Sequence, residues 1–164
     1  MKTPFADELK NKYLQGAGRY AGKVEGCSEQ EIEEIRLAQR VDRLPNIYRQ
    51  FLAVMGREDG RLFLGTDVCY PEILEAKGAV AGLLHINGNP FPFPEDAVVF
   101  SVHQGYHITY FQTSNNEDDP AVYSYLEGDS EPDLAANHLS TFLSDEVEKR
   151  IAGIKQRKKS KGPH

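Results

Sequence analysis

The clearest pattern of apolar and polar positions lies between residues 43 and 56, in RLPNIYRQFLAVMG. Apolar residues recur there at spacings of one and three, which is typical of one face of a helix. Pro45 suits the first helical position, because its missing amide hydrogen would have no partner there, and Gly56 suits a left-handed helix end. We predict a short helix whose apolar face packs on a sheet. The expected core residues of this segment are Leu44, Pro45, Tyr48, Phe51 and Leu52.

Three further segments predict helices. Residues 28–41 begin with Ser28 and Glu31 in capping-box spacing, which marks a helix start. Residues 70–84 carry a proline near the start and acidic residues in the first turn, and residues 137–154 form an amphipathic pattern that closes the chain.

Four segments predict strands because they are rich in β-branched and aromatic residues or are bounded by turn residues. They are residues 60–65, 97–103, 106–113 and 121–127. The links between the last three are short, which favours an antiparallel meander. We therefore predict an α+β fold, with a mainly antiparallel sheet and helices packed against it.

The length of 164 residues fits one domain. We expect a lead-in over residues 1–26, with a short helix at 4–14, then a domain over 27–152 and a disordered basic tail over 153–164. No apolar run approaches the ~18 residues of a membrane span, and the N-terminus lacks the apolar stretch of a secretory signal. The expected location is the cytoplasm, where Cys27 and Cys69 would remain structural thiols.

Charge is distributed unevenly. The formal net charge is -6, yet residues 1–150 hold 14 basic and 25 acidic residues, a difference of -11. An acidic surface repels nucleic acid phosphates and attracts basic proteins. We expect a basic protein as partner, and neither nucleic acid nor a membrane.

The acidic residues concentrate between positions 117 and 133, where no basic residue occurs. Three interpretations stay open. The residues form acidic loops that their charge keeps in solution, or they form a surface that docks a basic protein with tyrosines as anchors. The third interpretation is calcium binding, for which no EF-hand spacing exists. The candidate partner-binding residues are Glu117, Asp118, Asp119, Tyr123, Tyr125, Glu127, Asp129, Glu131 and Asp133.

The motifs that could indicate catalysis or cofactor binding are incomplete in this sequence. GAGRYA at 16–21 matches the dinucleotide-binding spacing but lacks the strand that should precede it. His103 and His107 can face one another across a hairpin, but no third metal ligand is identifiable from spacing. No nucleophile elbow or phosphate loop is present. We expect no catalytic residue, cofactor or metal. A hydrolase that uses His103 or His107 remains an alternative to the binding functions described below.

Several motifs occur in an order that resembles a known family. They are Leu44-Pro45 with Tyr48, Phe51 and Leu52, Phe100-Ser101 with the Gly105-Tyr106 turn, Asp119-Pro120-Ala121-Val122-Tyr123, and HLSTFL at 138–143. Across residues 28 to about 145 the chain resembles the SUKH superfamily, which includes the fungal Smi/Knr-type cell-wall synthesis regulators and many bacterial immunity proteins. Met55-Gly56 departs from the usual Asn-Gly, and His138-Leu139 from the usual Ser-Phe.

The resemblance implies an α+β domain that works by binding. It typically implies an immunity protein that occludes a toxin such as a nuclease, and alternatively a regulatory or scaffold protein related to the cell-wall regulators. The oligomeric state does not follow from the sequence.

Overall fold

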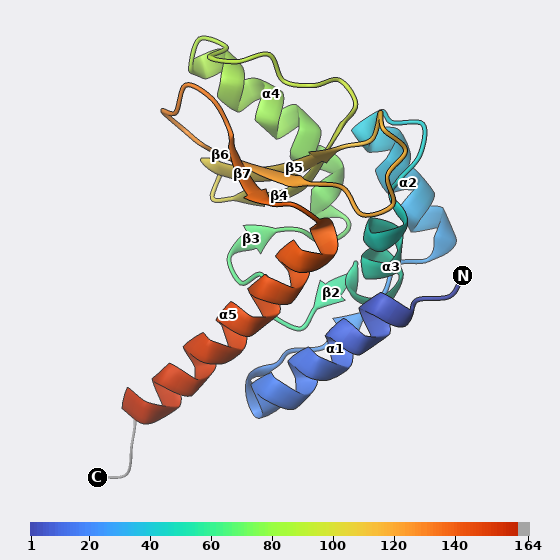
Figure 1. Cartoon of the computed structure of the whole chain (residues 1–164), viewed down its shortest axis with the longest axis vertical. Helices are drawn as coiled ribbons and strands as arrows, with labels where there is room; N and C mark the ends of the chain where they lie inside the picture. Colours follow the sequence, from blue (N-terminus) through green and yellow to red (C-terminus); the bar gives the residue numbers. More distant parts are fainter. Residues whose placement is uncertain (161–164) are drawn as a thin grey trace.

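A five-stranded antiparallel sheet lies at the centre of the structure, a computed structural model that describes residues 1–160 (Figure 1). Each strand pairs with its neighbour in sequence, in the order β3-β4-β5-β6-β7. The strands are β3 (Thr66–Asp67), β4 (Ala97–His103), β5 (His107–Gln112), β6 (Val122–Leu126) and β7 (Asp133–Ala136). A separate two-stranded sheet pairs β1 (Val24–Glu25) with β2 (Glu58–Asp59). The predicted α+β class and antiparallel meander are confirmed.

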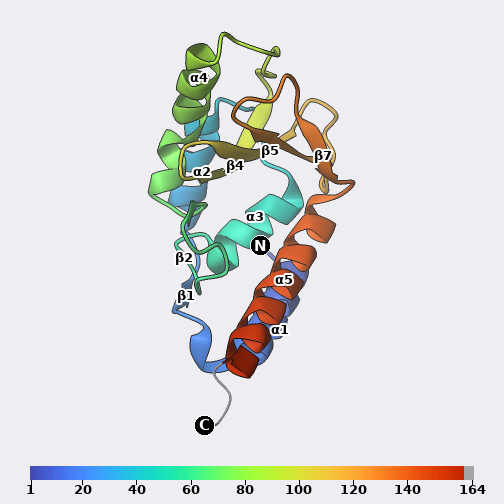
Figure 2. The same cartoon turned by 90° about the vertical axis from the view of Figure 1, so that its left-hand side faces the viewer.

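Helices cover both faces of this sheet. They are α1 (Pro4–Ala17), α2 (Glu29–Gln39), α3 (Asn46–Met55), α4 (Ala76–Ile86) and α5 (Leu139–Ser160), with 3-10 turns at Gly18–Tyr20 and Glu72–Glu75. Figure 2 shows α4 on one side of the sheet and α3 with α5 on the other. The segment 87–96, which follows α4, lies on the α4 side, where Phe93 meets Tyr110 of β5 at a ring distance of 5.0 Å. We call this segment the strap.

The predicted helix at 43–56 forms as α3, and its apolar face packs on the sheet as expected. Tyr48 lies 5.3 Å from Phe111 and Phe51 lies 5.4 Å from Phe100, measured between ring centroids. All five predicted core residues are buried.

Two details of the α3 ends differ from the prediction. Pro45 precedes the first helical residue, and Gly56 has a φ of -77°, so it is not left-handed. Glycine is needed there for space, because a Cβ would lie 2.5 Å from the carbonyl oxygen of Leu52 and 2.7 Å from Cys27 Sγ.

The capping box at the start of α2 is confirmed. The Glu31 amide donates to Ser28 Oγ at 3.1 Å, and the Ser28 amide donates to Glu31 Oε1 at 2.9 Å. The strand predicted at 60–65 is wrong, because that segment forms turns. The Asp59 carboxylate accepts hydrogen bonds from the amides of Arg61 and Phe63, and these side-chain bonds replace a ladder.

Both ends of the described chain are more ordered than predicted. Helix α1 packs against α3 and α5, and its buried Tyr13 donates to the carbonyl oxygen of Gly60 at 2.6 Å (Figure 1). The boundary predicted at residue 152 is wrong, because α5 continues to Ser160 with Ile154 buried. The apolar contact of Ile154 extends the helix past the point where composition turns basic. Residues 161–164 of the predicted tail lie outside the described residues.

The loop between β5 and β6 ties the sheet to two helices. Asp118 forms an ion pair with Arg43, and its carbonyl oxygen accepts the Ile47 amide at 3.0 Å near the start of α3. Asp119 accepts the Ser140 amide at 2.8 Å and the Ser140 hydroxyl, so it caps the first turn of α5 from a distant part of the chain.

The Tyr48 hydroxyl gives a first prediction. Within residues 1–160, it is the one buried side-chain oxygen or nitrogen without a hydrogen-bond partner. A buried unsatisfied hydroxyl costs about 1–3 kcal/mol. Tyr48→Phe should therefore raise the free energy of unfolding by about 1 kcal/mol in urea titrations followed by circular dichroism. The matched control is Tyr13→Phe, which removes a satisfied hydroxyl and should lower it. Equal losses for the two variants would contradict our account of Tyr48.

The Asp119 cap gives a second prediction. Asp119→Ala should lower the free energy of unfolding by about 1–2 kcal/mol, because two donors at the start of α5 lose their acceptor. Glu117→Ala is the control in the same loop, and it should change stability by less than about 0.5 kcal/mol, because Glu117 is exposed. Similar effects of the two substitutions in the same urea titration would show that the cap contributes nothing.

Candidate partner-binding surface

The seven acidic residues predicted as one surface separate into a group before β6 and a group after it. Glu117, Asp118 and Asp119 precede this strand, Glu127, Asp129 and Glu131 lie in the turn that follows it, and Asp133 begins β7 opposite Ser124. Five extended residues span about 17 Å, so the two groups do not merge. The structure therefore brings together only Glu127, Asp129, Glu131 and Asp133.

The first acidic group has a structural role in the described fold. Asp118 pairs with Arg43, and Asp119 caps α5, so their charges are already engaged. Glu117 is exposed and forms no hydrogen bond or ion pair among the described residues. The charge of Asp118 is offset by Arg43, whereas Asp119 keeps its negative charge and uses both carboxylate oxygens to cap α5.

The second acidic group is open to solvent. Glu127 accepts a hydrogen bond from the Asn87 side chain at 3.3 Å, which places the β6–β7 turn next to the end of α4. The carboxylates of Asp129, Glu131 and Asp133 are exposed and carry no hydrogen bond or ion pair within residues 1–160. These three side chains form an unneutralised acidic stretch.

Neither of the two tyrosines predicted as interface anchors is fully exposed. Tyr125 is fully buried, its hydroxyl donates to the carbonyl oxygen of Asp129 at 3.0 Å, and its ring lies 5.0 Å from Phe91. It shapes the acidic turn from within the core and does not reach the surface. Tyr123 is partly exposed and stacks on Tyr110.

Exposed apolar side chains accompany the acidic turn. Leu126 is 45% exposed and Tyr106 is 39% exposed, and the Glu127 amide donates to the carbonyl oxygen of Tyr106 at 2.8 Å. Sequence reasoning missed Leu126, although strand alternation places it outward once Tyr125 points inward. We define the hairpin surface as Tyr106, Leu126, Asp129, Glu131 and Asp133.

The two strand histidines lie beside this surface. His103 and His107 are paired across the β4–β5 hairpin, which confirms the predicted juxtaposition. His103 Nδ1 lies 2.8 Å from Thr66 Oγ1, and His107 Nε2 lies 3.1 Å from Ser124 Oγ. Within residues 1–160 no carboxylate bonds either ring, so a Ser-His pair lacks the acid that would orient it. The described residues also contain no His, Cys, Asp and Glu group fit for a metal.

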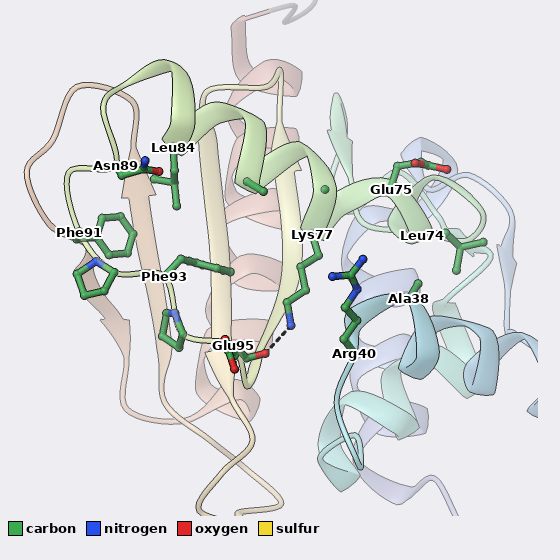
Figure 3. Close-up of a pocket in the computed structure, with 14 residues that line it drawn as sticks. Ala38, Arg40, Leu74, Glu75, Lys77, Leu84, Asn89, Phe91, Phe93 and Glu95 are labelled. Atoms are coloured by element: carbon green, nitrogen blue, oxygen red, sulfur yellow. Dashed lines mark hydrogen bonds between the residues drawn. The ribbon is translucent and has the colours of Figure 1, made fainter.

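A groove runs along α4 on the other side of the sheet (Figure 3). It encloses about 660 Å³ between this helix, the strap and the end of α2. Lys77 closes its floor, since its ammonium donates to the carbonyl oxygens of Gln39 and, at 2.8 Å, Glu95. The apolar lining includes Leu74, Ala81, Leu84, Phe91 and Phe93.

The cysteines and the GAGRYA motif add no candidate binding or catalytic site among the described residues. Both cysteines are free, and burial raises the pKa of Cys27 and of Cys69 to about 12, which keeps the thiols protonated at neutral pH. GAGRYA spans the end of α1 and a 3-10 turn, without the strand that the dinucleotide motif requires. Among residues 1–160, no helix has the length and apolar character needed to cross a bilayer.

Comparison with known proteins identifies the family. A search of curated proteins finds no match. The family model described as the SMI1 / KNR4 family (SUKH-1) matches residues 26–145, which contain α2, α3, the whole five-stranded sheet and the start of α5. This range also contains the aromatic packing of α3 on the sheet and the hairpin surface. The chain belongs to the SMI1/KNR4 (SUKH-1) family.

Proposed function

We propose that this chain is an immunity protein that neutralises a basic toxin domain, such as a nuclease, by binding it. Family membership supports a SUKH domain, and the hairpin surface is the observation that carries the finer assignment. Three carboxylates without a hydrogen bond or ion pair among the described residues lie there beside exposed Leu126 and Tyr106, on the β7 side of β6. Exposed apolar side chains next to unneutralised charges are typical of a protein-binding surface.

The charge of the chain supports a basic partner. Residues 1–150 carry an excess of 11 negative charges, so a basic domain would be drawn to this surface from a distance. Electrostatic attraction of this kind accelerates association and also rejects acidic competitors. An immunity protein benefits from both effects, because it must reach the toxin before the toxin reaches its target.

The proposed mechanism is occlusion. Neutralisation by occlusion needs a rigid surface and no reacting group. The hairpin surface is held rigid from below, because Tyr125 fixes the turn through the carbonyl oxygen of Asp129. The paired histidines use one ring nitrogen each on a hydroxyl, as part of the same sheet. A regulatory or scaffold role related to the cell-wall regulators is the alternative, and it calls for several partners of modest affinity.

A third prediction tests the hairpin surface. The proposal expects a toxin gene beside the gene for this chain, and the purified C-terminal domain of that toxin serves as the probe. The triple variant Asp129→Lys, Glu131→Lys, Asp133→Lys should bind it at least about 100-fold more weakly in calorimetry, because attraction becomes repulsion at three positions. The same variant should no longer relieve growth arrest in a bacterial host that expresses the toxin domain.

The control variant changes the same total charge elsewhere. Glu8→Lys, Asp42→Lys, Asp145→Lys also moves the net charge from -6 to 0, at exposed positions away from the hairpin. It should keep most of the affinity and should still relieve growth arrest. Equal losses in the two triple variants would reject the hairpin surface. A neighbouring toxin domain that the unmodified chain neither binds nor neutralises would reject the immunity role, and capture of several non-toxic partners would favour the regulatory alternative.

A further inference from the structure

The solvent-exposed face of helix α4 has an unusual residue composition. Between Gly78 and Ile86 it contains no Asp, Glu, Lys or Arg. The outward positions of this stretch are small or apolar apart from His85, and Ile86 is 80% exposed. A helix on a protein surface normally carries charged residues on its outer side, and one that is apolar all round is normally buried. The outer face of α4 thus has the composition of a covered helix.

The strap continues this apolar face. Phe91 and Phe93 are partly exposed, and with the small residues of α4 they line the groove of about 660 Å³ (Figure 3). Their inner sides are already used, since Phe91 meets Tyr125 and Phe93 meets Tyr110. What remains open is a groove along α4 whose lining is mainly apolar, with charged residues at the end near the start of the helix.

Two glycines in α4 have no explanation within the chain. A Cβ at Gly78 or Gly82 would meet no atom within 4 Å, and neither residue has a positive φ. Glycine inside a helix lowers stability relative to alanine, so the fold alone would favour alanine at both positions. The open space above both positions leaves room for a backbone from outside the chain to approach closely.

The two ends of the groove differ in charge. At the start of α4 lies Arg40, whose guanidinium has no hydrogen bond or ion pair among the described residues. This end also carries the negative charges of Glu75 and Glu95 and the positive charge of Lys77. With the positive charge of Arg40, its net charge is zero. The other end, next to Asn87, carries Glu127 and the acidic turn that follows it.

A two-fold axis through the middle of α4 would pair unlike ends. Helix α4 is about 16 Å long, so an antiparallel second α4 would bring Arg40 of each copy toward Glu127 of the other. A parallel arrangement would place one acidic turn against the other. The antiparallel arrangement also opposes the two helix dipoles, which is the favourable orientation.

We propose that two copies of this chain associate through antiparallel contact of their α4 helices, each copy covering the other's apolar groove. The apolar faces supply the buried area, and the glycines allow the two helix backbones to approach. The attraction between Arg40 of one copy and Glu127 of the other sets how the two helices align. This contact involves the chain alone. Its test therefore needs no toxin and stands or falls separately from the immunity role.

A fourth prediction follows for the purified full chain. Sedimentation velocity between about 1 µM and about 1 mM should show a reversible monomer–dimer equilibrium. Ala81→Glu should weaken the dimer at least about 100-fold, because it buries a charge at the centre of the contact. Ala152→Glu is the matched control, an exposed helical alanine on α5, and should leave self-association unchanged. Circular dichroism confirms that both variants fold.

A charge swap tests the antiparallel register. Arg40→Glu and Glu127→Arg should each weaken the dimer about tenfold, and the double variant should recover most of the loss, because the swapped charges face each other again across the two-fold axis. The proposal is overturned if the unmodified chain stays monomeric up to about 1 mM, or if Ala81→Glu and Ala152→Glu self-associate alike. A double variant no better than its singles would reject the antiparallel register.

Discussion

Aromatic packing of α3 on the central sheet is the interaction on which the rest of the structure depends. Tyr48 contacts both Phe100 of β4 and Phe111 of β5, and Phe51 adds a second contact to Phe100. Edge-on and tilted aromatic pairs of this kind add to the free energy gained from area burial, and they fix the relative orientation of the helix and the strands. They hold one helix across two neighbouring strands, and so set where the sheet is covered and where it is left open.

The part of the sheet that helices leave open is the part where we propose that a toxin domain binds. Phe142 at the start of α5 reaches Phe100, while the far ends of β4, β5 and β6 carry partly exposed histidines and exposed Leu126. The acidic residues that stabilise the fold and those that face solvent lie at different ends of the sheet. Asp118 and Asp119 fasten the covered end to α3 and α5, whereas the hairpin surface occupies the open end.

Features with short-range causes could be predicted from the sequence. The α3 stripe, the capping box of Ser28 and Glu31, and the meander all depend on neighbours a few residues apart. The strand predicted at 60–65 failed because the side chain of Asp59 takes the amide hydrogens that a ladder would use. The end of α5 was misplaced because Ile154 finds its apolar surroundings through tertiary packing.

The candidate site was only partly predictable, for a geometric reason. Sequence proximity joins seven acidic residues, but the extended strand β6 separates Glu117, Asp118 and Asp119 from the acidic residues of the β6–β7 turn. The direction of Tyr125 depends on which face of β6 the strap covers, and Phe91 settles this from more than thirty positions away. Nothing in a local pattern reveals that contact.

The two proposed contacts rest on different forces, and ionic strength separates them. Attraction of a basic domain to the hairpin surface acts over distances at which salt screens it strongly. Two copies of a chain with net charge -6 repel one another, and salt screens that repulsion along with the Arg40–Glu127 attraction. The apolar contact of α4 with the opposite groove is insensitive to screening, because it depends on area removed from water. Self-association should therefore vary little with salt, whereas binding of a basic toxin domain should weaken as salt rises.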